Sequence, residues 1–340
     1  MKDRFLRACW RESVDCTPVW FMRQAGRSSP SYRDIRKDHG VLEIAKTPAL
    51  ATEVALQPIR EMGVDAAILF CDLLVPLEAM GASVRIEDRV GPVVESPIRM
   101  AADVDRLRRF DPNADLAFVR ETIQRMRAKL DVPVIGFAGA PFTLASYLIE
   151  GGPTREFEAT KRFMHTEPDA WNRLMRLLAE GVAGFLRMQA EAGAQALQLF
   201  DSWAGALSPR DYRDNVQPHS RAVFEGIRET GVPTIHFGTG TAGFLDAFRG
   251  AGGDVIGVDW RIPLDRAWSV IGDEVGIQGN LDPAVLSASP GTWRAATTDI
   301  LAQADDRAGH IFNLGHGVFP STPQEALRGV VDLVHVTTRR

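Results

Sequence analysis

The sequence is poor in cysteine and has no long apolar run. Its 340 residues include three cysteines, Cys9, Cys16 and Cys71, and no pair of them has CxxC spacing. This number and spacing exclude a secreted-type disulfide framework and predict reduced thiols in a cytoplasmic protein. Charged residues interrupt the apolar ones near the N-terminus, and no window of 18 apolar residues occurs. We therefore expect no signal peptide, no membrane-spanning helix and no membrane partner.

Lysine is also scarce, because only five of the 39 basic residues are lysines. The formal net charge is -5, which argues against a nucleic-acid partner that is bound through its phosphates. A codon bias would explain the excess of arginine. The same excess supplies many planar guanidinium groups, which suit the recognition of carboxylates better than the ammonium group of lysine does.

What the sequence does contain is typical of a globular protein, with 45% hydrophobic and 24% charged residues. Eight short apolar runs recur, and each is followed by polar or glycine residues and then by a helical pattern. Continuous apolar runs favour strands that are buried on both faces of a parallel sheet. The eight runs cover residues 18–22, 66–70, 132–137, 196–200, 233–237, 254–258, 275–278 and 310–313.

Two helical stretches stand out between these runs. They cover residues 171–192 and 242–249, and we expect Gly193 and Gly250 to end them. Eight strand–helix repeats predict an α/β fold, a (β/α)8 TIM barrel that forms a single domain over residues 1–340. An open doubly wound sheet is the alternative. Residues 84–98 alternate and contain Gly91-Pro92, which predicts a small β-hairpin outside the barrel with its turn at that dipeptide.

In such a barrel the active site is built from the loops that follow the strands, where helix N-termini also favour anionic ligands. Polar candidates lie just past the apolar runs, and each has a structural alternative. The arginines would form surface ion pairs, Asp72 would cap a helix, and the histidine would be a hydrogen-bonded structural residue. These candidates are Arg23, Gln24, Gly26, Arg27, Asp72, Tyr147, Ser202 and His316.

The sequence predicts neither a metal nor a cofactor. His236 has no cysteine nearby, since all three cysteines precede residue 72. A zinc site would need three protein ligands drawn from histidine, cysteine and acidic residues. We find no dinucleotide fingerprint, no GxxxxGK phosphate loop and no lysine in a strand. The expected chemistry therefore relies on general acid–base and electrostatic catalysis.

Several motifs together resemble the uroporphyrinogen decarboxylase family. They are PVWFMRQAGR, FCDLLVPLEAMG, GFAGAPFTLASYLIEGG, LQLFDSWAGALSP, FGTGT, VIGVDWR, QGNLDP and NLGHGVFPSTP, and they occur in the family's order almost end to end. The resemblance implies a (β/α)8 domain that is usually a homodimer. It also implies that the four acetate side chains of uroporphyrinogen III lose their carboxyl groups as CO₂, without a cofactor or metal. The product is coproporphyrinogen III, on the route to haem.

The resemblance also implies roles for the candidate residues. Asp72 would accept hydrogen bonds from the pyrrole N–H groups and stabilise the ring cation that precedes loss of CO₂. The residues that would hold the substrate are Arg23, Gln24, Ala25, Gly26, Arg27, Arg36, Tyr147, Ser202 and His316. Ser28 and Ser31 depart from the family, which usually has an aromatic and an acidic residue there, and this puts the packing of the loop in doubt.

Three questions stay open at this point. Arg23 or Arg27 would act as the proton donor through a water, or both would only bind carboxylates. A corrinoid-dependent methyltransferase has the same fold but carries a His-x-Cys zinc motif, whereas the residue two after His236 is Gly238. A non-catalytic tetrapyrrole-binding protein would bind the substrate without releasing CO₂.

Overall fold

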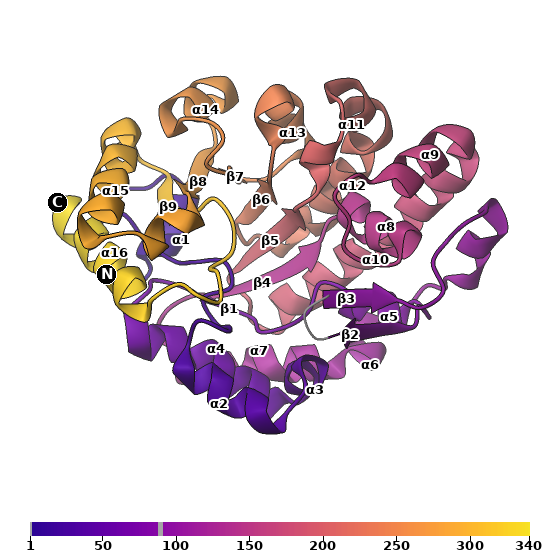
Figure 1. Cartoon of the computed structure of the whole chain (residues 1–340), viewed down its shortest axis with the longest axis horizontal. Helices are drawn as coiled ribbons and strands as arrows, with labels where there is room; N and C mark the ends of the chain where they lie inside the picture. Colours follow the sequence, from indigo (N-terminus) through magenta and orange to yellow (C-terminus); the bar gives the residue numbers. More distant parts are fainter. Residues whose placement is uncertain (1, 88–90) are drawn as a thin grey trace.

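The computed structural model describes residues 2–87 and 91–340, and one curled parallel sheet organises them (Figure 1). Each strand pairs with the strand that follows it in this sheet, which excludes an open doubly wound order, where the chain reverses direction across the sheet. In spatial order the strands are β1 (Ala67–Ile68), β4 (Val134–Gly139), β5 (Ala196–Asp201), β6 (Thr234–Gly238), β7 (Val255–Gly257), β8 (Gly276–Leu281) and β9 (His310–Leu314).

The first predicted strand, residues 18–22, closes the barrel without becoming a regular strand. Val19 forms a single parallel bridge with Phe312 of β9. The Phe312 N–H donates to the Pro18 carbonyl at 2.9 Å, and on the other side the Asp65 N–H donates to the Val19 carbonyl at 2.8 Å. The segment therefore lies between β9 and the start of β1, in the eighth position of the predicted barrel.

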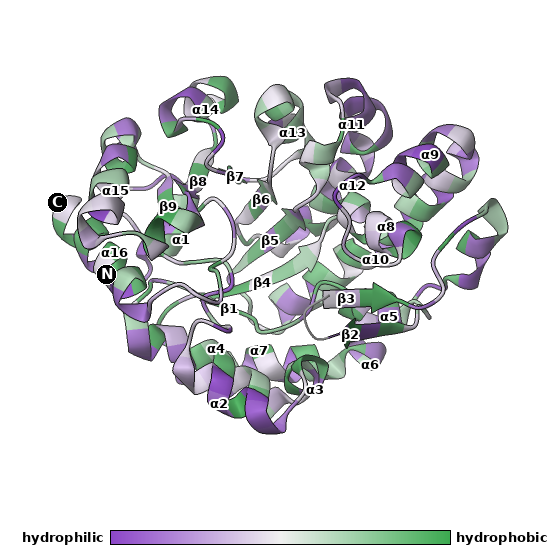
Figure 2. Ribbon diagram, in the orientation of Figure 1, coloured by the Kyte–Doolittle hydropathy of each residue, from purple (hydrophilic) through white to green (hydrophobic). Residues whose placement is uncertain are grey.

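Helices surround the sheet, and their ribbons carry both hydrophobic and hydrophilic patches, as expected when one face packs on the strands (Figure 2). The α-helices are α1 (Arg4–Cys9), α2 (Pro30–Asp38), α3 (Val41–Lys46), α4 (Pro48–Met62), α5 (Val75–Ala79), α6 (Pro112–Asp115), α7 (Ala117–Lys129), α8 (Pro141–Glu150), α9 (Glu158–Thr166), α10 (Pro168–Glu191), α11 (Pro209–Asn215), α12 (Gln217–Ile227), α13 (Leu245–Ala251), α14 (Leu264–Ile271), α15 (Pro290–Ala304) and α16 (Gln324–Thr337). Five short 3-10 helices complete the described elements: η1 (Ala101–Arg106), η2 (Ala204–Ala206), η3 (Arg228–Thr230), η4 (Thr241–Phe244) and η5 (Pro283–Ser287). None of the helices in the described residues is long and apolar enough to cross a membrane.

Of the two helices predicted in most detail, one is followed by the glycine expected to end it and the other continues through that glycine. The helix predicted over 171–192 is α10, and Gly193 follows it with a φ of 112°. The helix predicted over 242–249 is η4 followed by α13, which runs through Gly250 and ends at Ala251. The prediction that Gly250 ends it was wrong. Gly252 does so, because its φ of 128° favours glycine and because a Cβ there would lie 2.8 Å from the Phe224 ring.

The predicted hairpin is present, but its turn is not where the sequence suggested. β2 (Val84–Glu87) and β3 (Gly91–Val94) pair antiparallel outside the barrel. Gly91 pairs with Glu87 and Pro92 with Ile86, so the predicted turn at Gly91-Pro92 was wrong and that dipeptide belongs to a strand. The connection falls in residues 88–90, outside the described residues. A two-stranded ribbon has only edge strands, so the missing N–H of Pro92 is tolerated.

A short chain of hydrogen-bonded polar side chains lies in the barrel interior. The Trp20 Nε1–H donates to Gln278 Oε1 at 2.9 Å, and Gln278 Nε2 donates to Gln198 Oε1 at 3.1 Å. All three side chains are buried. One hydrophobic cluster runs through the described chain from Phe5 to Val334. We propose from this continuity that the chain forms one domain over residues 1–340.

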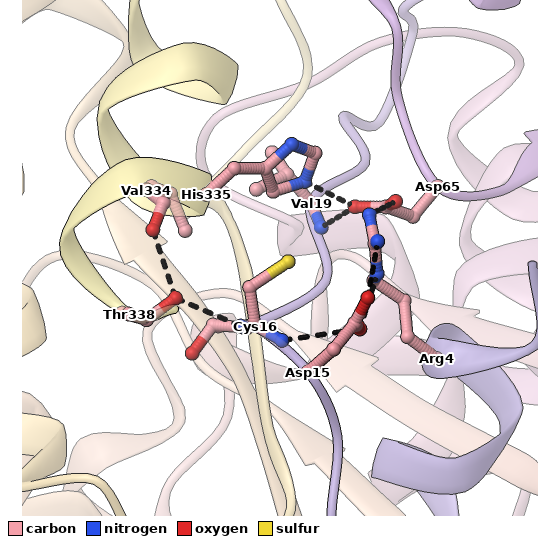
Figure 3. A network of polar contacts seen from close by, with 9 residues as sticks. Arg4, Asp15, Cys16, Val19, Asp65, Val334, His335 and Thr338 are labelled. Atoms are coloured by element: carbon pink, nitrogen blue, oxygen red, sulfur yellow. Dashed lines mark hydrogen bonds and ion pairs between the residues drawn. The ribbon is translucent and has the colours of Figure 1, made fainter. Parts of the chain in front are cut away.

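Asp65 connects the two ends of the chain to the closing segment (Figure 3). Its carboxylate, 8% exposed, accepts hydrogen bonds from the Val19 N–H at 2.8 Å, from Arg4 at 2.7 Å and from His335 at 2.7 Å. Arg4 belongs to α1 and His335 to α16. Arg4 also forms a two-pronged pair with Asp15, at 2.9 and 2.8 Å, which holds the pKa of Asp15 well below its usual value.

Replacing Asp65 should therefore destabilise the fold. Asp65→Ala leaves the Val19 N–H and two cationic or hydrogen-bonding side chains without a buried partner, which costs about 3 kcal/mol of unfolding free energy. Asp131→Ala is the matched control, because Asp131 pairs with Lys2 at 2.6 Å on the surface, and its loss should cost less than about 1 kcal/mol. Urea unfolding measures both values. Equal losses in the two variants would contradict the role given to Asp65.

Candidate active site

The loop of residues 23–27 is fixed by the buried side chain of Gln24. Its Oε1 accepts from the Phe21 N–H at 3.0 Å, and its Nε2 donates to the Ala66 carbonyl at 2.9 Å. The Gln24 side chain, which is 1% exposed, ties the loop to the start of β1. It does not reach the mouth of the barrel, the end formed by the loops that follow the strands. Arg23 has a φ of 62°, a left-handed conformation that costs a non-glycine residue of order 1 kcal/mol or more. The hydrogen bonds of Gln24 therefore stabilise this backbone conformation at Arg23, whose side chain is exposed.

The glycines on either side of His316 allow two close approaches. A Cβ on Gly317 would lie 2.4 Å from the Cδ of Arg23, so the aliphatic part of Arg23 packs directly on that backbone. A Cβ on Gly315 would lie 2.6 Å from the backbone nitrogen of Trp260. These contacts place His316 between the loop after the closing segment and the loop after β7. The sequence suggested that these glycines expose His316 to a ligand, and the structure shows that they also serve packing.

His316 is neutral at pH 7, and its tautomer follows from one hydrogen bond. The Gly317 N–H donates to its Nδ1 at 2.7 Å, so the ring proton lies on Nε2. Burial, together with the positive charges of Arg23 and Arg261, lowers the pKa of His316 to about 4, while the charge of Asp259 acts in the opposite direction. The half-buried ring can therefore donate a hydrogen bond through Nε2 without carrying a charge.

Asp72 follows β1 at the mouth and combines the two roles considered from the sequence. Its Oδ1 accepts from the Leu74 N–H at 2.9 Å, in the turn that leads into α5. Among the described residues nothing donates to its Oδ2. Burial raises the pKa of Asp72, the Leu74 hydrogen bond lowers it, the charge of Glu78 raises it, and that of Arg23 lowers it. Oδ1 of Asp72 thus holds the turn before α5, and Oδ2 is available to a ligand from a largely buried position.

Tyr147 and Ser202 lie on neighbouring parts of the mouth. Tyr147 belongs to α8, and its ring is 4.1 Å from that of Trp203 between centroids. Burial, together with the charge of Asp72, raises the pKa of Tyr147 to about 12, and the charge of Arg23 acts in the opposite direction. The hydroxyl is therefore protonated and lies within electrostatic reach of both groups. Ser202 follows β5, and its carbonyl accepts from Thr239 Oγ1 at 2.6 Å. Its partly exposed hydroxyl has no hydrogen-bond partner among the described residues.

Arg27 and Arg36 form a second group, around Tyr32. Burial raises the pKa of Tyr32, and the charges of Arg36 and Arg27 both lower it, so both cations lie near its ring. Arg27 is exposed, and Arg36 donates to the His39 carbonyl. The structure thus brings Arg23, Asp72, Tyr147 and His316 together and sets Arg27 and Arg36 beside them. Ala25 and Gly26 are partly exposed in the loop between the two groups.

The two departures from the family pattern have partners of their own. Ser28 Oγ accepts from Gln324 Nε2 at 3.0 Å, which joins the loop to the start of α16. Ser31 Oγ donates to Glu61 of α4 at 2.7 Å. The loop is therefore packed and hydrogen-bonded with serine at both positions, which answers the doubt about its packing.

Three phenylalanines form an apolar floor that the sequence analysis did not single out. Phe137 and Phe200 lie 5.5 Å apart and Phe200 and Phe237 lie 5.8 Å apart between ring centroids, both edge to face. His236 stacks on Phe248 of α13, outside the sheet, so Phe237, the next residue of the strand, points inward. The sequence signal for this floor is a phenylalanine near the end of each of the strands β4, β5 and β6.

The surroundings of His236 do not match a His-x-Cys zinc site. His236 Nε2 lies 3.9 Å from Asp201 Oδ2, and both side chains are fully buried between the sheet and its helices. A Cβ on Gly238 would lie 2.8 Å from Phe248, so a cysteine would not fit at that position without movement. Within residues 2–87 and 91–340 no group of three His, Cys, Asp or Glu side chains is placed to hold a metal ion.

Two solved structures with a similar fold are a methyltransferase and a methionine synthase. A methyltransferase from Methanosarcina mazei superposes with a TM-score of 0.78 at 21% identity, over 99% of this chain and 98% of that chain. A B12-independent methionine synthase from Shewanella sp. W3-18-1 has a TM-score of 0.56 at 12% identity, over 85% and 88% of the two chains. At such identities the likeness concerns the fold alone.

Sequence comparison is more specific. Residues 1–337 match the family described as Uroporphyrinogen decarboxylase (URO-D). A uroporphyrinogen decarboxylase of Sorangium cellulosum is 53% identical over 341 residues, which cover 100% of this chain and 97% of the relative. One from Carboxydothermus hydrogenoformans is 51% identical over 337 residues, covering 98% and 96%. The chain therefore belongs to the uroporphyrinogen decarboxylase family.

Proposed function

We propose that this enzyme removes the carboxyl groups of the four acetate side chains of uroporphyrinogen III as CO₂ and produces coproporphyrinogen III in tetrapyrrole biosynthesis. The observation that carries the proposal is the convergence of Arg23, Asp72, Tyr147 and His316 on one mouth of the barrel, above an aromatic floor. Relatives named uroporphyrinogen decarboxylase, 51–53% identical over nearly the full chain, support it.

The substrate itself accepts the electrons that decarboxylation releases. A proton adds to the ring carbon beside the acetate-bearing carbon and makes the pyrrole a cation. The bond to the carboxylate then breaks, its electron pair neutralises the ring, and CO₂ leaves. A second proton converts the exocyclic methylene to a methyl group, and the first proton departs from the ring. Each acetate thus consumes one proton and releases one CO₂.

Asp72 suits the stabilisation of that cation. Its Oδ2 has no donor among the described residues, and burial disfavours its charge until a positive partner arrives. The pyrrole N–H groups supply such donors, and the protonated ring supplies the positive charge. A carboxylate fixed in advance by the Leu74 N–H does not need to reorient during the reaction, which is the condition for strong electrostatic catalysis.

The two arginines of the 23–27 loop are not equivalent. Arg23 affects the pKa values of Asp72, Tyr147 and His316, whereas Arg27 affects that of Tyr32. We assign Arg23 to the reacting side chain, as the group that delivers the proton through a water, and Arg27 with Arg36 to the binding of carboxylates. Arginine is a weak acid, so its part is to hold and polarise the water.

The remaining candidates would orient the macrocycle. Tyr147 and His316 each offer a neutral donor, and Ser202 offers a hydroxyl. Ala25 and Gly26 contribute backbone, and Gln24 acts by holding that backbone in place. Under this proposal the enzyme acts as a homodimer, as the family resemblance implies, and in the cytoplasm, as its few unpaired cysteines predict.

The function and the role of Asp72 are tested together. Wild-type protein incubated with uroporphyrinogen III under reducing conditions should yield products with seven to four carboxyl groups, and their absence would leave a tetrapyrrole-binding protein. Asp72→Asn keeps an acceptor for the Leu74 N–H and should lower kcat by ~10²-fold or more. Asp111→Asn is the control, because Asp111 Oδ1 accepts from the Asn113 N–H at 3.0 Å in a similar turn on the surface. Turnover of folded Asp72→Asn at the wild-type rate would refute the role.

The assignment of Arg23 predicts different effects for the two lysine variants. Arg23→Lys should lower kcat and change the solvent isotope effect on kcat, because it alters the group that polarises the water. Arg27→Lys should raise KM and leave kcat and its isotope effect unchanged, because it weakens only binding. Steady-state kinetics in H₂O and D₂O over a range of pH measure both. If both variants change only KM, neither arginine takes part in proton transfer.

His316 should titrate near pH 4 with its proton on Nε2. A histidine whose pKa is lower in the folded state than in the unfolded chain favours unfolding in acid, so its effect should appear as the pH falls from about 6.5 towards 4. Nitrogen-detected NMR of labelled histidine measures the pKa and the tautomer. Arg23→Gln should raise this pKa, because a neighbouring positive charge is removed. A wild-type midpoint near 6.5 would contradict the buried, neutral state.

A further inference from the structure

Arg261 lies in the loop after β7 and is held more firmly than a surface arginine usually is. Its backbone N–H donates to Asp259 Oδ1 at 3.1 Å, and its guanidinium Nη1 pairs with Asp259 Oδ2. The guanidinium carbon lies 4.3 Å from the centroid of the Trp260 ring. One neighbouring residue thus fixes the end of the side chain, and the next supports its flat face.

Asp259 is itself fixed, so it can act as a support. Its side chain is 2% exposed, and its Oδ2 also accepts from the Gly240 N–H at 2.7 Å. Asn280 Nδ2 donates to the Asp259 carbonyl at 2.9 Å. The support therefore involves the ends of three neighbouring strands, β6, β7 and β8, and fixes the direction in which Arg261 leaves the loop.

The guanidinium keeps free donors in spite of this pairing. The Arg261 side chain is 52% exposed, and its Nε and Nη2 have no hydrogen-bond partner among the described residues. The loop also lies against the mouth, because Trp260 packs on Gly315, next to His316. Gly240, which Asp259 holds, follows Thr239, whose hydroxyl bonds to Ser202. Arg261 thus stands on the rim between His316 and Ser202.

The position of Arg261 complements that of the other arginines. Arg23, Arg27 and Arg36 all come from one stretch of chain, after the segment that lies between β9 and β1. β7 is separated from that segment by β8 and β9 on one side. Uroporphyrinogen is a disc with carboxylates around its whole edge, so arginines from one stretch of chain do not reach all of them.

We propose that Arg261 binds a propionate carboxylate of the substrate on the β7 side of the mouth, with His316 between it and Arg23 and with Asp259 and Trp260 as its support. A propionate fits better than an acetate, because Arg261 lies on the rim, whereas the acetate that reacts is the one assigned to Arg23. A guanidinium presents two parallel N–H donors to a carboxylate, and the Nε and Nη2 atoms form such a pair. The inference rests on the proposed function for the identity of the substrate.

The test compares Arg261→Gln with a matched control elsewhere. Arg261→Gln should raise KM for uroporphyrinogen about tenfold and leave kcat within about twofold, because a contact present before and during the reaction contributes to binding alone. Arg261→Lys should recover part of the loss. Arg294→Gln is the control, since Arg294 is an exposed arginine on the ring of Trp293, 4.7 Å away, in α15, and it should leave KM unchanged.

Two further measurements separate a binding contact from a structural one. Propionates persist through the reaction, so the same rise in KM is expected with the five-carboxyl intermediate as substrate. A rise confined to uroporphyrinogen would instead assign Arg261 to an acetate and overturn the choice of propionate. If Arg261→Gln and Arg261→Lys lower Tm and activity equally, Arg261 serves only to hold Asp259 and the proposal is wrong. An unchanged KM would also overturn it.

Binding without turnover keeps this test independent of the proposed function. Uroporphyrin III, the oxidised and unreactive form of the macrocycle, can be titrated into each variant while tryptophan fluorescence is recorded. Arg261→Gln should raise the Kd about tenfold relative to wild type and to Arg294→Gln. If the wild type binds the macrocycle but releases no CO₂, the proposed function fails while the role of Arg261 in binding can still be measured.

Discussion

The seating of Val19 between β9 and Asp65 is the constraint on which the active site depends. The carbonyl of Val19 accepts from the Asp65 backbone and its N–H donates to the Asp65 carboxylate, so one short segment closes the barrel. The loop that carries Arg23 begins four residues later, and Gln24 ties it to Ala66 at the start of the next strand. A shift of this segment would move Arg23 relative to Asp72, because both are positioned by the same pair of neighbouring chains.

The mouth of the barrel holds two positive side chains on either side of one neutral imidazole. Arg23 and Arg261 stand on either side of His316, and burial together with their charges keeps the imidazole neutral. Asp72 is the acid in this part of the mouth whose charge burial disfavours. Before substrate binds, the site therefore combines exposed cations with a carboxyl group whose ionised form is disfavoured by burial. An octacarboxylate whose pyrrole ring becomes a cation during the reaction satisfies both conditions, with carboxylates for the arginines and a cation for Asp72.

Much of the fold could be predicted from the sequence, because buried parallel strands leave continuous apolar runs. All eight runs occupy barrel positions, yet residues 18–22 pair through a single bridge, since a side chain 46 positions away supplies one of their partners. Such a partner has no local signal. Likewise, the flanking glycines of His316 suggested a ligand, but their packing against Arg23 and Trp260 depends on distant loops. The aromatic floor and the support of Arg261 went unnoticed, because both arise only when neighbouring strands are aligned.

The packing of Arg23 on Gly317 has a consequence for the making of the enzyme. Contacts between these two regions span almost the whole chain, as in the bond between Ser28 and Gln324, which are 296 positions apart. During synthesis the ribosome delivers the arginine loop first and Gly317 much later. Until residues 315–317 emerge, the aliphatic part of Arg23 has no backbone to pack against and one side of the mouth is missing. The nascent chain therefore has no assembled site until these two distant regions have met.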